Sequence, residues 1–167
     1  MIDRVGNKYK HSSTLEHINF TFFIQGISRS VLQELARHRI ASLSVKSTRY
    51  TLKELKVLNL FKDDDYELVS KFIVLTSNEM VNKASIRAIN SLILILKSGV
   101  SNDLAKYALP ESFKTDVTWS INLRSLQNFI NLRSSKSALW EIQILSKEIM
   151  KSIPQEYSYL IENFYNE

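Results

Sequence analysis

The sequence of 167 residues contains no cysteine. This absence excludes a disulfide framework and a zinc site with cysteine ligands. It also excludes a cysteine thiolate as the nucleophile of an enzymatic reaction. A chain without disulfides fits the cytoplasm, which is the location we expect.

Glycine is scarce as well: the chain holds three, Gly6, Gly26 and Gly99, and they lie far apart. This spacing excludes both the G-x-G-x-x-G turn of dinucleotide-binding folds and the G-x-x-x-x-G-K-[ST] phosphate loop. If the protein binds phosphate groups, arginine side chains and helix ends must therefore bind them.

Long apolar runs are also missing. The best candidate, SLILIL at 91–96, is much shorter than the roughly 20 residues of a membrane-spanning helix. The first residues, MIDRVGNKYK, are polar and do not resemble a signal peptide. We therefore expect no membrane partner.

The histidines of the chain do not predict a metal site. His38 is flanked on both sides by arginine, and these positive charges would repel a cation. The other two histidines flank Glu16, an arrangement that ordinary structural hydrogen bonds explain. The acidic run at 63–65 is interpreted as the start of a helix, with a metal site as the weaker alternative. We expect no bound metal.

Composition and pattern predict one domain over residues 1–167 in the α+β class, mainly helical, with a small central antiparallel or mixed sheet. Alternating apolar residues predict strands, and apolar residues three and four apart predict helices. The expected strands cover 18–24, broken by Gly26, and 114–122. The expected helices cover 1–9, a segment that Ser28 caps and that runs to Arg37, 101–110, 122–133 and two segments within 137–165. The segment 66–97, up to Gly99, is expected to form one long helix or a pair of helices. The segment 11–17 is expected to be a connection, and 43–50 short extended or irregular chain.

One segment, RHRIASLSVKSTRY at 37–50, concentrates positive charge without any acid, in a chain whose net charge is +5. Like charges within one segment repel each other, so we expect a negative partner from outside it. Nucleic acid, a nucleotide or a phosphorylated cofactor would supply that charge. A surface with spare basic residues is the alternative that composition leaves open.

The expected helix 122–133 carries polar side chains on one face, namely Arg124, Asn128 and Asn131. Arg133 instead continues the apolar line of Leu126 and Phe129. An arginine on an apolar face is costly unless it is paired, because it keeps its charge. A salt bridge to a carboxylate and a side chain that extends from the helix end into solvent are the ordinary explanations.

Three separated blocks of the chain resemble a known family. RHRIASLSVKS, an arginine-histidine-arginine followed after seven residues by Ser47, resembles the signature of the flavin-dependent thymidylate synthases. HSSTLEHINFTF at 11–22 is similar to the segment upstream of that signature. NLRSLQNFINLR at 122–133, followed by ALWEIQ at 138–143, is similar to the downstream segment. The blocks occur in the family's order and span most of the chain.

The resemblance implies an enzyme that methylates dUMP to dTMP. Methylenetetrahydrofolate would supply the carbon, and NADPH the hydride, which passes through FAD. The lack of cysteine agrees, because the other class of thymidylate synthase attacks uracil with a thiolate. The resemblance also implies a homotetramer with shared active sites and no nucleic-acid partner.

The resemblance further implies roles for individual residues. The implied flavin contacts are Ser13, Arg37, His38, Arg39, Asn122, Leu123, Arg124 and Asn128. The implied substrate contacts are Gln33, Glu34, Arg37, Val45, Ser47, Arg49, Lys106 and Arg133. His11 matches an active-site histidine, and Arg133 resembles the catalytic arginine. Such a fixed cation would lower the pKa of the uracil ring nitrogen at position 3, so substrate becomes the expected partner of Arg133.

The chain departs from the family pattern in several places. Val45 replaces a common glutamate, Lys106 a usual arginine, and Ser137 a common histidine near the flavin. Family members usually have a further N-terminal segment, so we expect this chain to be truncated. Two other hypotheses stay open: a basic module that binds nucleotides or nucleic acid through 29–49, and a catalytically inactive protein with the same fold.

Overall fold

The computed structural model describes residues 3–9 and 11–165. Its chain forms two compact units. The first unit comprises 1–24, 33–44 and 117–167, and the second comprises 25–32 and 45–116. Compact units of this kind also occur within single domains, so one domain over the whole chain stays a prediction.

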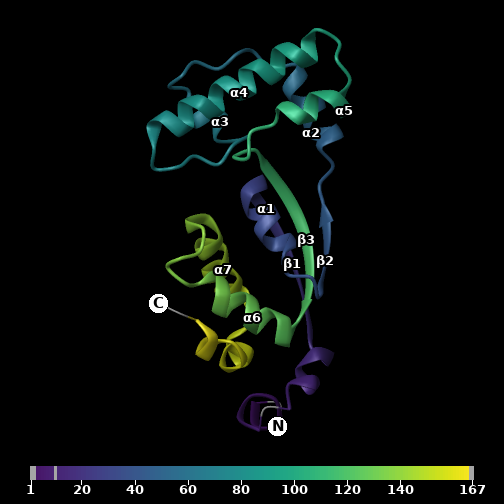
Figure 1. The fold of residues 1–167 in the computed structure, drawn as a ribbon, viewed down its shortest axis with the longest axis vertical. Helices are drawn as coiled ribbons and strands as arrows, with labels where there is room; N and C mark the ends of the chain where they lie inside the picture. The colour runs from purple at the N-terminus through teal and green to yellow at the C-terminus, as the bar shows by residue number, and fades with distance from the viewer. Residues whose placement is uncertain (1–2, 10, 166–167) are drawn as a thin grey trace. The chain divides into compact units, whose positions relative to one another are not determined.

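The helices and strands follow one another along the chain as Figure 1 shows. The strands are β1 (Asn19–Ser28), β2 (Ala41–Val45) and β3 (Lys114–Asn122). The α-helices are α1 (Arg29–Ala36), α2 (Thr48–Lys56), α3 (Tyr66–Val69), α4 (Glu79–Lys97), α5 (Asn102–Ala105), α6 (Leu123–Arg133) and α7 (Trp140–Ser152). Short helices of other types are η1 (Asp3–Lys8), η2 (Ser12–His17), η3 (Lys106–Ala108), η4 (Gln155–Leu160) and η5 (Glu162–Phe164).

The three strands form one sheet in the order β1-β3-β2. The hydroxyls of Thr21 and Ser120 lie 2.9 Å apart, and the Gly26 N–H donates to Oδ1 of Asp116 at 3.0 Å. Residue numbers therefore rise along β1 as they fall along β3, so these strands are antiparallel. The expected α+β class, mainly helical with a small sheet, is confirmed.

Gly26 does not break the first strand, contrary to the sequence prediction. β1 runs through it to Ser28. Gly26 adopts a φ of 70°, a conformation that glycine reaches without steric cost, and its N–H is held by Asp116. The strand therefore continues through a local kink. Ser28 then caps α1 as predicted, because its Oγ accepts the Val31 N–H at 3.1 Å.

The segment 66–97 forms two helices, α3 and α4, as the pair of helices left open by the sequence, but the residues between them are not helical. Between them the backbone pairs with a segment about forty residues later. The Val74 N–H donates to the Ser112 carbonyl at 2.8 Å, and the Lys114 N–H donates to the Phe72 carbonyl at 2.8 Å. Asn78 then caps α4 by accepting the Val81 N–H. This distant pairing overrides local helix propensity.

Other boundaries differ in smaller ways. The segment 11–17 contains the helical turn η2 rather than a plain connection. The segment 43–50 is strand to Val45 and helix from Thr48. The end expected at Gly99 is confirmed: α4 stops at Lys97, and Gly99 follows with a φ of 91°. The rest of the C-terminal prediction corresponds to α7 and two short helices.

In the second unit, α4 supplies the central hydrophobic surface. Its buried residues recur at helical spacing, as in Ile86, Ile89 and Ile93, and they pack with buried leucines of α2 and with Phe113. Figure 1 shows α2 and α5 beside this long helix. No helix among residues 3–9 and 11–165 is long and apolar enough to cross a membrane.

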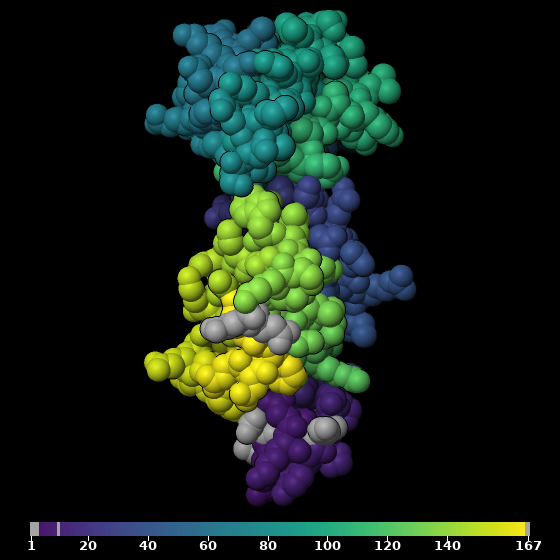
Figure 2. All heavy atoms as spheres, turned by 60° about the vertical axis from the view of Figure 1, so that its left-hand side comes forward, coloured from purple at the N-terminus to yellow at the C-terminus, as the bar shows by residue number. Residues whose placement is uncertain are grey.

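In the first unit, α6 packs against the sheet. Trp119 of β3 is fully buried between Phe22 and Phe129, with ring centroids 6.1 and 4.9 Å away. Figure 2 shows the purple N-terminal residues against the yellow C-terminal ones. Gln127 joins them, since its Nε2 donates to Oδ1 of Asn7 and to the Leu160 carbonyl. These contacts fix α6, which carries most of the site described next.

Candidate functional site

An open pocket of about 640 Å³ in the first unit gathers positive charge. It is lined by Glu16, Arg37, His38, Arg39, Ile40, Arg124, Ser125, Asn128, Leu132 and Arg133. We call it the basic pocket. Six of these ten residues are among those that the sequence singled out, and they come from the turn after α1 and from α6. Folding therefore brings together two segments that are about ninety residues apart.

Arg133 forms the most enclosed charged group of the basic pocket. Its side chain is 13% exposed. Nη1 donates to Oε2 of Glu34 at 2.5 Å, Nη2 donates to the Glu34 carbonyl at 3.3 Å, and Nε donates to Nε2 of His38 at 3.0 Å. The salt bridge to a carboxylate, which the sequence left open as an ordinary explanation, is therefore present, whereas a contact of Arg133 with substrate stays a prediction.

His38 is buried, and its environment disfavours the charged imidazolium. Burial is the main cause, and the neighbouring Arg133 adds to it, so the pKa of His38 falls from 6.5 to about 4 although Glu34 opposes the shift. The ring lies edge-on to Phe129, with centroids 5.1 Å apart. Because Nε2 accepts from Arg133, the proton of the neutral ring lies on Nδ1.

The acids that the segment 37–50 lacks come from elsewhere in the fold. Arg37, 71% exposed, contacts Glu34 one helical turn earlier at 3.3 Å. Lys46 pairs with Asp116 at 3.5 Å. Two cations of the segment therefore have carboxylate partners from outside it, so a ligand is not the only source of negative charge for them. Exposed ion pairs contribute little to stability, so a ligand can replace them at small cost.

Arg39 and Arg124 differ in whether they pair with a carboxylate. Arg39 is exposed, and none of the residues described in the structure forms an ion pair with it. Arg124 pairs with Glu16 at 2.5 Å. Glu16 is a pocket residue that sequence reasoning did not select. Its position in η2, next to His17, carries no signal for an arginine 108 positions away.

Helix α6 presents one face to the basic pocket. Asn128 is exposed there, and Ser125 and Leu132 join it at helical spacing, a signal that could have identified both. Asn122 is the N-cap, since its Oδ1 accepts the Ser125 N–H at 2.9 Å. Leu123 is fully buried, so its side chain has a packing role instead of a place on the pocket wall.

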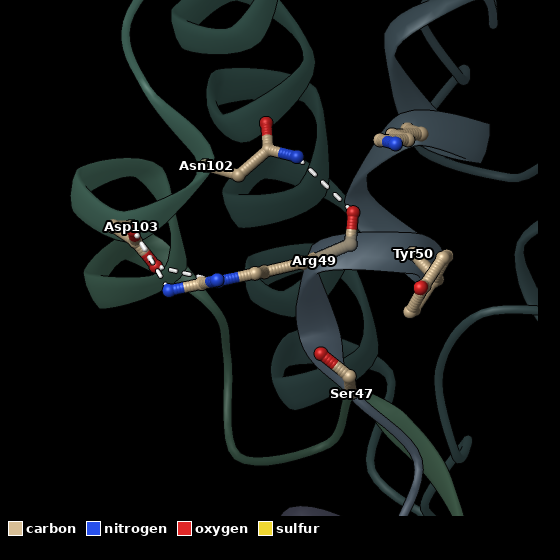
Figure 3. A pocket seen from close by; sticks show the side chains of 6 residues that line it. Ser47, Arg49, Tyr50, Asn102 and Asp103 are labelled. Carbon is tan, nitrogen blue, oxygen red and sulfur yellow. Dashed lines mark hydrogen bonds and ion pairs between the residues drawn. The ribbon is translucent and has the colours of Figure 1, made fainter.

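A second pocket, of about 400 Å³, lies in the second unit and is lined by Ser47, Arg49, Tyr50, Lys53, Asn102 and Asp103. We call it the Arg49 pocket. Figure 3 shows Arg49 pointing toward Asp103, with Nε and Nη2 donating to the two carboxylate oxygens at 3.1 and 3.2 Å. Asn102 donates to the Arg49 carbonyl. Both residues predicted here, Ser47 and Arg49, face one cavity, whereas Tyr50 and Lys53 were not predicted.

The remaining predicted residues lie outside these two linings. Lys106 does contact a residue of the Arg49 pocket, because its Nζ lies 3.9 Å from Oδ1 of Asp103. His11 and Ser13 are exposed at the start of η2. Gln33 is exposed on α1, and Val45 is exposed at the end of β2. Within one chain, these four residues are not brought to either pocket.

The depressed pKa of His38 predicts a specific loss of stability in acid. An unfolded chain binds a proton at this histidine near pH 6.5, whereas the folded chain binds it only near pH 4. The contribution of His38 to stability should therefore fall as pH decreases through this window and stay constant above it. The full shift corresponds to about 3 kcal/mol.

The substitution His38→Gln tests this prediction, because glutamine does not titrate and can still accept from Arg133. We expect its free energy of unfolding in denaturant to fall less than that of the wild type between pH 7 and pH 4. The two proteins differ only at position 38, so the difference between their profiles isolates His38. Identical pH profiles would contradict the prediction.

The chain matches known proteins along its length. The family model described as thymidylate synthase complementing protein matches residues 1–157. The flavin-dependent thymidylate synthase of Wolinella succinogenes is 62% identical over 160 residues, which cover 96% of this chain and 78% of that protein. The enzyme of the same name from Campylobacter jejuni is 60% identical over 163 residues, covering 98% and 79%.

The solved structures agree with this match. The flavin-dependent thymidylate synthase of Helicobacter pylori, crystallised with FAD and dUMP, superposes with a TM-score of 0.94 at 51% identity. The match covers 99% of this chain and 82% of that one. Identity at this level over nearly the whole chain shows common descent as well as a common fold. The chain therefore belongs to the flavin-dependent thymidylate synthase family.

Proposed function

We propose that this protein converts dUMP to dTMP by reductive methylation. The carbon comes from methylenetetrahydrofolate, and the hydride comes from NADPH through bound FAD. The observation that carries the proposal is the basic pocket, where six predicted residues converge in a chain of this family. The Helicobacter pylori relative was crystallised with FAD and dUMP, which supports both ligands here.

The basic pocket fits a flavin dinucleotide in charge and in size. Four arginines and one glutamate line it, and its volume lies within the range of about 300–1,000 Å³ typical of ligand pockets. Arg37, Arg39 and Arg124 offer exposed guanidinium groups to a pyrophosphate. They would take the place of the glycine-rich phosphate loop that the chain lacks. When bound, FAD would supply the hydride-transfer chemistry that amino-acid side chains lack.

The Arg49 pocket suits the phosphate of dUMP. Arg49 holds its donors in the planar fork that binds carboxylates and phosphates with two hydrogen bonds. Asp103 occupies that fork in the free chain, so a phosphate dianion would compete with an exposed carboxylate. The Ser47 hydroxyl and Lys53 of the same pocket add further donors.

Arg133 has the properties of a group that stabilises negative charge on a uracil ring. It is a permanent cation in a largely buried position, where electrostatic interactions are stronger than in water. Three of its five N–H groups are engaged, which leaves two donors for an anion in the pocket. Stabilising the ring anion would favour attack by carbon 5 on the incoming carbon.

Flavin binding separates this proposal from a basic nucleic-acid module. We expect purified protein to show the visible absorption band of a flavin, directly or after addition of FAD. The double substitution Arg39→Gln and Arg124→Gln should weaken FAD binding, because it removes two exposed cations of the basic pocket. Arg87→Gln, which breaks an exposed pair with Asp63 in the second unit, is the matched control.

The same experiment distinguishes an inactive protein with this fold. Bound FAD without formation of dTMP from dUMP would reject the proposed reaction. Absence of flavin binding at saturating FAD would reject the hypothesis that this protein binds a flavin. Formation of dTMP by FAD-loaded protein supports the proposal over both alternatives.

The absence of cysteine predicts resistance to thiol-modifying reagents. With no thiol in the chain, these reagents have no group of their usual class to attack. We expect FAD-loaded protein to keep its turnover at reagent concentrations that inactivate a cysteine-dependent thymidylate synthase assayed in parallel. Loss of activity in the cysteine-free chain would contradict this expectation.

A further inference from the structure

We propose that Glu34 is a positioning residue that holds the guanidinium group of Arg133 in its working orientation. The catalytic role of this orientation rests on the proposed function, whereas the contact between Glu34 and Arg133 does not depend on it. It gives Glu34 a different role from the nucleotide contact that the sequence implied. The site then depends on a carboxylate that orients the reactive cation from behind.

The contacts of Arg133 come from a single neighbouring element, the end of α1 with the turn that follows it. Glu34 supplies two of the three acceptors, its carboxylate and its own backbone carbonyl. The carboxylate takes Nη1 and the carbonyl takes Nη2, so both branches of the guanidinium group are fixed. A planar group held at both branches and at Nε cannot rotate about its long axis without losing hydrogen bonds.

The third acceptor is fixed in its turn. His38 is buried and lies edge-on to Phe129, and Phe129 packs against the fully buried Trp119. The His38 ring therefore presents Nε2 to Arg133 from a rigid surface. Glu34, 27% exposed, is the part of this arrangement that a substitution can loosen without opening the core.

Arg37, the other cation near Glu34, is held less firmly than Arg133. Arg37 approaches both carboxylate oxygens, at 3.3 and 3.4 Å, but it is 71% exposed. Contacts at such a surface are weak and easily exchanged with water. Glu34 can therefore release Arg37 to a ligand and keep Arg133, because the Arg133 contact is shorter and largely enclosed.

Charge and position make opposite predictions for Glu34, which makes the role testable. A carboxylate beside Arg133 partly cancels the positive charge that substrate would feel. If charge alone mattered, Glu34→Gln should speed the reaction. If position matters more, the same substitution should slow it, since a misplacement of about 1 Å can cost up to roughly 10²-fold in rate.

The first measurement needs no catalysis. In the NMR spectrum of FAD-loaded protein, the Nε–H signal of Arg133 is identified by its loss in Arg133→Lys. We expect hydrogen exchange of this proton to accelerate at least about 10-fold in Glu34→Gln, because a released side chain meets solvent. Glu148→Gln, which removes an exposed carboxylate paired with Lys151 outside the pocket, should leave it unchanged. Unchanged exchange in Glu34→Gln would overturn the proposal.

The second measurement uses turnover. We expect Glu34→Gln to lower kcat for dTMP formation by roughly 10-fold to 10²-fold with little change in the KM for dUMP, and Glu34→Asp to lower it less. Added to Arg133→Ala, Glu34→Gln should cost little more, since both changes remove one function. A raised KM with unchanged kcat, or full additivity, would instead show a direct substrate contact. Wild-type protein without turnover would reject the proposed function, and the exchange measurement would still decide the role of Glu34.

Discussion

Replacing Arg133 by alanine is expected to abolish most dTMP formation while the fold persists. Removing one preorganised electrostatic donor typically costs about 10²-fold to 10³-fold in kcat, so turnover should fall by at least about 10²-fold. The fold should tolerate the change because Glu34 stays partly exposed and keeps Arg37 as a neighbour at 3.3 Å. Steady-state formation of dTMP by FAD-loaded protein measures the effect.

Two further variants make the result specific. Arg133→Lys keeps the positive charge but loses the planar fork, so we expect activity between those of the wild type and the alanine variant. Arg87→Ala removes an exposed arginine that pairs with Asp63 outside the basic pocket, and it should retain wild-type turnover. Turnover near the wild-type level in Arg133→Ala would show that the catalytic role was assigned to the wrong arginine.

The elements that the sequence predicted well are those in which one face is buried along the whole element. β3 was predicted as residues 114–122, and its buried residues alternate, as Val117, Trp119 and Ile121 show. The helix expected over 122–133 begins one residue later, after its cap. In both cases local pattern and tertiary packing agree, so the pattern alone was sufficient.

The pattern failed where distant backbone pairing decides the structure. The residues between α3 and α4 were included in a helical segment, but Phe72 and Val74 pair with the chain around Ser112. A hydrogen bond between residues so far apart in the chain cannot be recognised from the local sequence of either segment. The same holds for the kink at Gly26, whose Asp116 partner lies 90 positions away.

Electrostatic partners show the same limit. The contact of Glu34 with Arg37 was readable, since residues three apart on a helix are neighbours. The contact of Glu34 with Arg133 spans 99 positions, and that of Arg49 with Asp103 spans 54. Segments 37–50 and 122–133 therefore appeared uncompensated. Six of the ten residues that line the basic pocket were nevertheless among those singled out, because a family motif records spatial neighbours that composition cannot, and their roles stay predictions.

The resemblance also implied a homotetramer with shared active sites, and subunit complementation should reveal it. Within one chain, Arg37 and Arg133 both contact Glu34, so this pair belongs to one subunit. Arg49 lies in a separate pocket in the second unit. We propose that assembly supplies the residues of each active site from more than one copy, which closed symmetry then repeats in every subunit.

The decisive mixture combines Arg49→Ala with Arg133→Ala, each of which we expect to be inactive alone. If a site takes Arg49 from one subunit and Arg133 from another, random reassembly leaves about one quarter of the sites with both arginines intact. The activity of the mixture should rise from near zero to a substantial fraction of the wild-type value. Mixing Arg37→Ala with Arg133→Ala is the matched control and should restore nothing, because both residues contact the same Glu34.

Subunit exchange must be demonstrated in both mixtures, for example by mass spectrometry of differently tagged chains. Recovery in the first mixture alone would locate the boundary between subunits within the site. No recovery in either mixture would mean that each site draws Arg49 and Arg133 from one chain. A monomer at the working concentration, measured by light scattering, would reject the assembly. An active monomer would then have to bind FAD and dUMP with the arginines of a single copy.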